Sequence, residues 1–219
     1  MAIETTYFTG TTAEANYAEV LAWLQANATD YFDNITADEG GEKIYCKIGD
    51  VTALTIDTNA RNYIFFATLK NGAVDYRYQA WGTNHRFTRA VKTSCGILLY
   101  VNNIDNIFIT KNTDGGVMLA GYHSTGNNTY GATIGDFAND SVFKDMGGGS
   151  GASFGVNQLK NVGVQSAGRT ALVPAVTDAG TYSDNLFFVP FTQFIGQSGI
   201  TIDVDGTKYV YNGVFALKE

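Results

Sequence analysis

The chain is poor in charge, because only 16% of its 219 residues are Asp, Glu, Lys or Arg. It contains two prolines, two cysteines and two histidines. The 14 basic residues are outnumbered by 21 acidic ones, which gives a net charge of −7, and they form no basic run. Nucleic acids and anionic membranes attract clustered basic residues, so neither is the expected partner. No stretch reaches the roughly 20 apolar residues that a membrane span needs.

The first residues lack the basic start and apolar run of a secretory signal peptide, and they include Glu4. We therefore expect synthesis and retention in the cytoplasm until release by another route. The cysteines, Cys46 and Cys95, lie in or beside apolar residues that alternate as in strands. Buried free thiols are expected, with a disulfide as the alternative.

The sequence lacks a recognisable catalytic or cofactor motif. Neither His85 nor His123 stands beside a nucleophile or a carboxylate, and two histidines alone do not make a zinc site. No Gly-x-Ser-x-Gly elbow occurs, and the glycine-rich residues 147–151 are not followed by the Lys-Ser/Thr of a phosphate loop. A carboxylate pair brought together by folding stays open. We expect no enzymatic activity, no cofactor and no metal.

Two acidic stretches carry the oxygen ligands that calcium prefers. The first runs from Asp30 to Glu42, and the second contains Asp203, Asp205 and Gly206. Neither follows the spaced ligand order of a known calcium loop. We interpret the first as a solvated connection and the second as a hairpin turn.

What the chain does contain favours β-structure. Hydrophobic residues make up 45% of the sequence and aromatic residues 13%, with 25 glycines. This composition suits strands and assembly surfaces better than a helical enzyme. We predict an α+β, mainly β fold of antiparallel sheets and meanders, with one N-terminal amphipathic helix and a short second helix.

Residues 44–67 return as residues 97–120 after a shift of 53 positions, with apolar residues matching apolar residues. Both segments alternate as strands do. A three-residue turn, Gly49-Asp50-Val51, would pair Cys46 with Leu54 and Ile44 with Ile56. The match indicates either an internal duplication or two ordinary meanders that can be slid into agreement.

The two segments differ on their other face. The first carries mixed, water-compatible residues there, whereas the second carries Leu98, Tyr100, Phe108 and Met118. A sheet that is apolar on both sides must be covered on both sides. We expect cover from the same chain, and we mark these four residues as the candidate interface should another chain provide it.

Two helices are predicted. Residues 1–10 form a lead that is either an arm or an edge strand. Thr11 and Glu14 then fit a capping box, and the apolar stripe of a helix to Ala28 faces the sheet of the first segment. That stripe consists of Tyr17, Val20, Leu21 and Leu24, with Trp23 beside it. The second helix spans residues 83–92, is capped by Thr83 or Asn84, and points Phe87, Ala90 and Val91 inward.

We divide the chain into three regions. Residues 1–122 form the helix and the duplicated β-hairpin core, residues 123–170 are a glycine-rich loop or arm, and residues 171–219 form C-terminal β-hairpins that pack on the core. Neighbouring subunits are a natural source of contacts for the glycine-rich region. Three strands are expected over residues 200–204, 208–211 and 214–217, with turns at Asp205-Gly206 and Asn212-Gly213.

Several segments resemble one group of proteins. They are the helix from Glu14 to Ala28 with the following Asp30-Tyr-Phe-Asp, the segment 91–99 that leads into Ile107-Phe-Ile-Thr-Lys, and the closing residues 206–217. Together these resemble uncharacterised virion-associated proteins of phages and prophages of Gram-positive, gut-type bacteria. The resemblance implies a tail, baseplate, neck or head-decoration role and supplies no functional residues.

Two functions follow as hypotheses. The first is a structural subunit of a tailed phage or a phage-tail-like particle, made in the bacterial host cytoplasm, whose partners are its own copies and other virion proteins. The alternative is a module that binds host-surface glycan by stacking sugars on Trp81, Tyr76, Tyr78 or Tyr130. Ordinary strand packing is the competing explanation for those four rings. A secreted or cell-surface adhesin is disfavoured because no signal is found.

Overall fold

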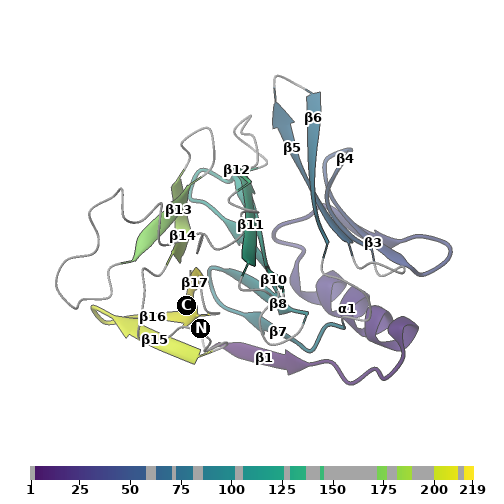
Figure 1. Cartoon of the computed structure of the whole chain (residues 1–219), viewed down its shortest axis with the longest axis horizontal. Helices are drawn as coiled ribbons and strands as arrows, with labels where there is room; N and C mark the ends of the chain where they lie inside the picture. Colours follow the sequence, from purple (N-terminus) through teal and green to yellow (C-terminus); the bar gives the residue numbers. More distant parts are fainter. Residues whose placement is uncertain are drawn as a thin grey trace.

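A computed structural model of the chain describes residues 3–57, 63–70, 73–80, 86–101, 106–125, 129–136, 144–145, 172–176, 182–188, 200–211 and 215–219. These residues form one helix and three antiparallel sheets, which confirms the predicted mainly β fold. Figure 1 shows the three sheets side by side, with one sheet between the other two.

Helix α1 (Ala13–Asn27) begins at Thr12, whose side-chain oxygen accepts a hydrogen bond from the Ala15 N–H at 3.1 Å. The predicted cap at Thr11 was therefore wrong by one residue. Four side chains of the helix are buried: Asn16, Tyr17, Val20 and Leu24. Leu21 and Trp23 are only partly buried. The helix thus has the expected 3.6-residue period, with a polar residue on its buried face.

The N-terminal sheet is a meander of β2 (Asn34–Ala37), β3 (Lys43–Ile48), β4 (Val51–Asp57), β5 (Tyr63–Lys70) and β6 (Ala73–Ala80). Ile44 pairs with Ile56 and Cys46 with Leu54, as predicted. The predicted three-residue turn was wrong, because Ile48 pairs with Val51 across two residues. The register instead shifts between Cys46 and Lys47, where Ala53 is an extra residue of β4 that forms a bulge. Because of this bulge, the neighbours Ala53 and Leu54 are both buried.

The central sheet has the order β1 (Glu4–Tyr7), β7 (Arg89–Lys92), β8 (Gly96–Tyr100), β9 (Asn106–Lys111), β10 (Val117–Thr125), β11 (Thr129–Asp136) and β12 (Lys144–Asp145). Strands β7–β11 repeat the neighbour order of β2–β6. Ile97 pairs with Ile109, which is the Ile44–Ile56 pair moved by 53 positions. Equivalent pairing supports the repeat as a structural unit, while a duplication in ancestry stays a prediction.

The predicted second helix was wrong for residues 89–92, which form strand β7, and residues 83–85 lie outside the described part of the chain. Neighbours Ala90 and Val91 are both buried because the central sheet is covered on both faces. Such a short apolar run fits a helix and a doubly covered strand equally well, and pairing with β1 and β8 decides between them.

The C-terminal sheet has the order β13 (Val173–Val176), β14 (Tyr182–Phe188), β17 (Phe215–Lys218), β16 (Thr207–Tyr211) and β15 (Ile200–Val204). The three predicted closing strands are confirmed to within one residue at most ends. Asp205 and Gly206 form the β15–β16 turn with positive φ angles of 52° and 79°. Asp203 accepts the Gly206 N–H at 3.0 Å, so this aspartate serves the turn.

The main core lies between the helix, the N-terminal sheet and one face of the central sheet. It includes Val20 and Leu24 of α1 together with Ile44, Ile56 and Ile97. The helix was expected to lie on the first segment's sheet, and its buried residues belong to a cluster that includes residues of that sheet and of the central sheet.

The predicted loop over residues 123–170 was wrong at its start, where residues 123–125 complete β10 and residues 129–136 form β11. The backbone ladder between these strands does not depend on bulky side chains, so glycine-rich sequence can still pair. Apart from β12, the later residues up to 171 lie outside the described part of the chain.

Candidate functional site

The four candidate interface residues are internal. Leu98, Tyr100, Phe108 and Met118 are each 0% exposed within this one chain. The C-terminal sheet covers their face, and the rings of Phe108 and Phe215 meet edge-on with centroids 5.2 Å apart. The second apolar face is therefore covered by the same chain, and in this conformation these four side chains are not accessible to a neighbouring subunit.

Polar contacts fix this intrachain seam. The Asp184 carboxylate accepts hydrogen bonds from the Thr113 N–H and hydroxyl, both at 2.8 Å. The Thr93 hydroxyl, in the β7–β8 turn, donates to the Lys218 carbonyl at 2.7 Å. These short bonds from two turns of the central sheet, together with the apolar contact, fasten the C-terminal sheet to the central sheet.

The four candidate glycan-stacking residues are distributed over different parts of the chain. Tyr76 and Tyr78 belong to β6, the edge strand of the N-terminal sheet, whereas Tyr130 belongs to β11 of the central sheet. Trp81 and His85 lie outside the described residues. His123 is in β10, opposite Gly131. The backbone thus brings two of the four tyrosine and tryptophan positions onto one strand.

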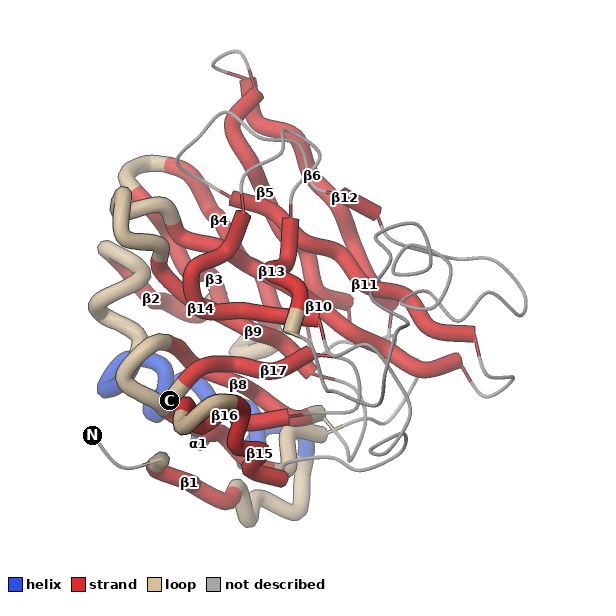
Figure 2. The backbone as a smooth tube through the Cα atoms, turned by 90° about the vertical axis from the view of Figure 1, so that its left-hand side faces the viewer, coloured by secondary structure: helices blue, strands red, loops and turns tan. Residues whose placement is uncertain are grey.

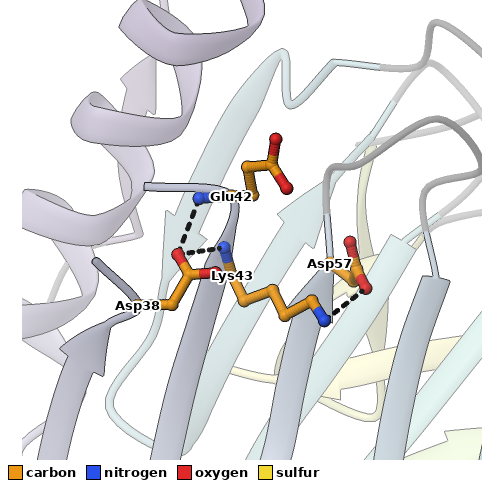
Figure 3. A network of polar contacts seen from close by, with 4 residues as sticks. All are labelled: Asp38, Glu42, Lys43 and Asp57. Atoms are coloured by element: carbon orange, nitrogen blue, oxygen red, sulfur yellow. Dashed lines mark hydrogen bonds and ion pairs between the residues drawn. The ribbon is translucent and has the colours of Figure 1, made fainter. Parts of the chain in front are cut away.

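The acidic stretch before β3 builds a turn (Figure 3). Asp38 accepts the backbone N–H groups of Glu42 at 2.7 Å and Lys43 at 3.0 Å, and these bonds hold the pKa of Asp38 below its usual value. Lys43 forms an ion pair with Asp57 at 3.5 Å, and the Asp57 charge raises the pKa of Lys43. Among the described residues, no group of three or more His, Cys, Asp or Glu side chains could hold a metal ion.

Both cysteines are free thiols, as predicted. Cys46 is buried in the main core, and burial raises the pKa of its thiol. Cys95 is only partly buried, and its sulfur donates to the Glu219 carbonyl at 3.5 Å. The expectation of burial therefore holds fully for Cys46 alone.

No other strand of the described residues pairs with the outer side of β1, so this open edge of the central sheet is the feature with the clearest capacity for contact. The Phe8 N–H donates to the Thr88 carbonyl at 3.0 Å, in register with the β1–β7 ladder. Hydrogen-bonded pairs alternate along an antiparallel ladder, so Glu4 and Thr6 point their backbone groups at β7. The backbone N–H and C=O groups of Thr5 and Tyr7 consequently point away from the sheet.

Helix α1 fastens this arm to the body. The Glu19 carboxylate accepts the N–H groups of Thr9 at 2.7 Å and Gly10 at 3.0 Å, and these bonds lower the pKa of Glu19. The Trp23 indole N–H donates to the Thr6 hydroxyl at 3.1 Å, and its ring meets Phe8 edge-on at 6.5 Å. These contacts hold β1 against the helix, and β1 lies at the periphery of the molecule in Figures 1 and 2.

Tyr7 is the exposed large hydrophobic residue of the described chain, with 67% of its surface accessible. We predicted an arm or an edge strand over residues 1–10 and singled out neither Thr5 nor Tyr7. An alternating Ile3-x-Thr5-x-Tyr7 pattern was the available signal, and it is too short to distinguish a strand from an extended arm.

Comparisons with known proteins give no relative. No protein-family model, no curated protein and no solved structure matches this chain. Within the described residues, no helix is long and apolar enough to cross a membrane.

Proposed function

We propose that this chain is a structural subunit of a tailed-phage virion or a phage-tail-like particle, and that it works by self-association and by docking to other virion proteins. The observation that carries this proposal is the open β1 edge, which α1 holds in place through Glu19 and Trp23. An edge that is both unpaired on one side and immobilised is suited to strand addition.

The packing of the body also supports a role in assembly. The second apolar face of the central sheet is buried by the C-terminal sheet, so docking would use sheet edges and the polar exterior. A charge content of only 16% lowers the desolvation cost of placing many copies side by side. The resemblance of segments 14–33, 91–111 and 206–217 to virion-associated proteins points in the same direction.

The proposed role needs no chemical step. The carboxylates of Asp38, Glu19 and Asp184 accept backbone N–H groups and so serve turns, the arm and the sheet seam. Of these three, Asp38 lies in the acidic stretch that was considered for calcium, and there it accepts the N–H groups of a turn.

Particles released by the bacterium that encodes the chain provide the test. Prophage induction, followed by density-gradient purification and mass spectrometry, should find the protein co-sedimenting with phage or tail-like particles. Deletion of its coding sequence should remove or truncate those particles. Absence of the protein from particles that are otherwise complete would refute the virion role.

The same material tests the glycan-binding alternative. If the purified chain binds host cell envelopes as a monomer, and Tyr76→Ala or Tyr78→Ala abolishes the binding, recognition of host glycan would replace self-assembly as the favoured function. A structural subunit predicts that these substitutions leave particle incorporation unchanged.

A further inference from the structure

We infer that the open edge of β1 docks against β1 of a second copy of this chain, in an antiparallel arrangement about a two-fold axis through Thr5. The inference deepens the proposed function, on which its biological meaning rests, by naming the contact surface and the partner. A two-fold pairing uses the same residues on both subunits, so the edge must be complementary to itself.

The directions of the backbone groups set the available registers. Thr93 of the β7–β8 turn donates its N–H to the Gly96 carbonyl at 2.9 Å, so the odd-numbered residues near β7 bond to β8. Within β7 the even-numbered residues Ala90 and Lys92 then bond to β1, and the Thr88 carbonyl just before β7 also accepts from the β1 side, through the Phe8 N–H at 3.0 Å. The Thr88 N–H, in contrast, donates to the Tyr100 carbonyl of β8 at 2.8 Å. Ile3, Thr5 and Tyr7 are therefore the residues whose N–H and C=O groups face outward.

An axis through Thr5 makes full use of these groups. Thr5 would lie opposite Thr5 of the second copy, and Ile3 would lie opposite its Tyr7. If the axis passed through Tyr7 or through Thr6, the outermost hydrogen-bonded pairs would need the backbone groups of Thr9. The Thr9 N–H is already donated to Glu19 at 2.7 Å, so those two registers forfeit hydrogen bonds.

The side chains favour the same register. Thr6 and Phe8 contact Trp23 on the helix side of the strand, which leaves Ile3, Thr5 and Tyr7 on the opposite side. In the Thr5-centred pairing, the exposed Tyr7 ring lies across from Ile3 of the second copy. An aromatic residue opposite a β-branched one is a favourable cross-strand pair. The pairing thus covers Tyr7, the exposed large hydrophobic side chain of the described residues.

The edge also lacks the usual protection against such pairing. Residues 3–7 contain no proline and no lysine, and the β1–β7 ladder runs without a bulge. Glu4 carries the only charge in this segment, and the Thr5-centred register places it opposite Thr6 rather than opposite its own copy. Like charges therefore do not face each other directly across the contact.

The contact is small. Stable complexes bury about 1,200–2,000 Å² in total, far more than two five-residue strand edges provide. We therefore expect a weak, concentration-dependent dimer in dilute solution. In a particle that holds many copies at fixed spacing, the same contact would be reinforced by its neighbours.

Cysteine cross-linking tests the register directly. In a Cys95→Ser background, Thr5→Cys should give a disulfide-linked dimer on mild oxidation, because a hydrogen-bonded antiparallel pair places its Cα atoms about 5.5 Å apart. Thr6→Cys is the matched control. Its two copies would lie diagonally, beyond the roughly 7 Å that a disulfide can bridge. We expect cross-linking at Thr5 to exceed that at Thr6 at least tenfold. Equal yields, or no dimer from Thr5→Cys at any concentration, would overturn the inference.

A proline substitution provides the second test. The Thr5 N–H points away from β7, so Thr5→Pro removes an outward donor without breaking the internal ladder. Its circular dichroism spectrum should match that of the natural chain, while its self-association measured by sedimentation velocity should be lost. An equally associated Thr5→Pro variant would refute the edge contact.

The failure of this inference can be told apart from failure of the proposed function. If the protein is found in particles but Thr5→Cys does not cross-link there, the edge contact fails and the virion role stands. If Thr5→Cys cross-links in solution but the protein is absent from complete particles, the edge contact stands and the virion role fails.

Discussion

Asn16 on helix α1 and Phe87 at the approach to β7 are joined by two hydrogen bonds. The Asn16 Nδ2 donates to the Phe87 carbonyl at 2.7 Å, and the Phe87 N–H donates to Asn16 Oδ1 at 2.9 Å. Both residues are buried although they are far apart in the chain. The side-chain amide completes the backbone hydrogen bonding of a segment that ends before β7 begins. It thereby fixes the helix to the central sheet.

Replacing Asn16 with Ala should destabilise the protein by about 2–4 kcal/mol, because it leaves a buried backbone N–H and a buried C=O without this partner. Urea unfolding followed by circular dichroism would measure the change. Ala18→Ser, on the exposed side of the same helix, should change the unfolding free energy by less than about 0.5 kcal/mol. A loss for Asn16→Ala no larger than that of the control would contradict the bridging role.

Gly96→Ala should disrupt the seam between the central and C-terminal sheets. A Cβ at this position would stand 2.7 Å from the Ile109 carbonyl oxygen and 2.8 Å from Leu217 Cδ1. The backbone oxygen cannot rotate away, so we expect a loss of about 1–3 kcal/mol in thermal or urea unfolding. Gly40→Ala is the matched control, because its Cβ would meet only the Glu42 Cγ at 3.9 Å. Equal stability of the two variants would show that the strands relax freely.

The contact between Phe108 and Phe215 should appear as a coupling energy. Phe108→Leu and Phe215→Leu each remove one ring from an edge-on pair, and the double variant removes both. A double-mutant cycle should give a coupling of about 0.5–1.5 kcal/mol beyond the separate losses. If the losses in unfolding free energy are additive, the two rings have no interaction energy. The C-terminal sheet would then not lie on the central sheet as described.

Acid should release the arm that carries β1. Hydrogen bonds to Glu19 lower its folded-state pKa below the ordinary value of 4.5. The stabilisation is therefore present above pH 4.5 and is lost as the pH falls through the lower folded value. Hydrogen exchange at Thr9 and Gly10 should accelerate in that window. Glu19→Gln should show fast exchange at these amides near neutral pH. If the amides stay protected in this variant, Glu19 does not hold the arm through these hydrogen bonds.

The two thiols should react at very different rates. Cys46 is buried with a raised pKa, and the thiolate is the reactive form, so iodoacetamide should modify Cys95 first. Mass spectrometry of a time course should show one alkylated site until the protein unfolds. Early modification of Cys46 would indicate that the main core opens more readily than its packing implies.

Local sequence patterns were sufficient for the parts of the fold in which one face is buried. The alternation of Ile44, Cys46, Leu54 and Ile56 predicted both strands and their pairing correctly. The same patterns did not predict the structure where both faces of a strand are buried, or where tertiary contacts determine whether a segment is a helix or a strand. Residues 89–92 fit a helix until β1 and β8 are known to flank them. The bulge at Ala53 could not be predicted from the sequence either. A three-residue turn without a bulge and a two-residue turn with a bulge both pair Cys46 with Leu54.

The candidate site was less predictable than the fold. Leu98 and Phe108 were identified as needing cover, yet only the assembled layers show that the last strands of the same chain provide it. The backbone N–H and C=O groups of Thr5 and Tyr7 face outward because Glu4 and Thr6 are the residues of β1 that bond to β7. The sequence does not indicate whether the odd-numbered or the even-numbered residues bond to β7, because the side chains alternate in the same way in both cases.

The mass of the purified protein in solution, measured by light scattering behind a sizing column over a concentration series, tests the central claim most directly. Assembly through the β1 edge predicts that the mass rises above the 23.6 kDa monomer as concentration increases, whereas the Thr5→Pro variant stays monomeric. A natural chain that remains at 23.6 kDa throughout, or a Thr5→Pro variant whose mass rises equally, would contradict it.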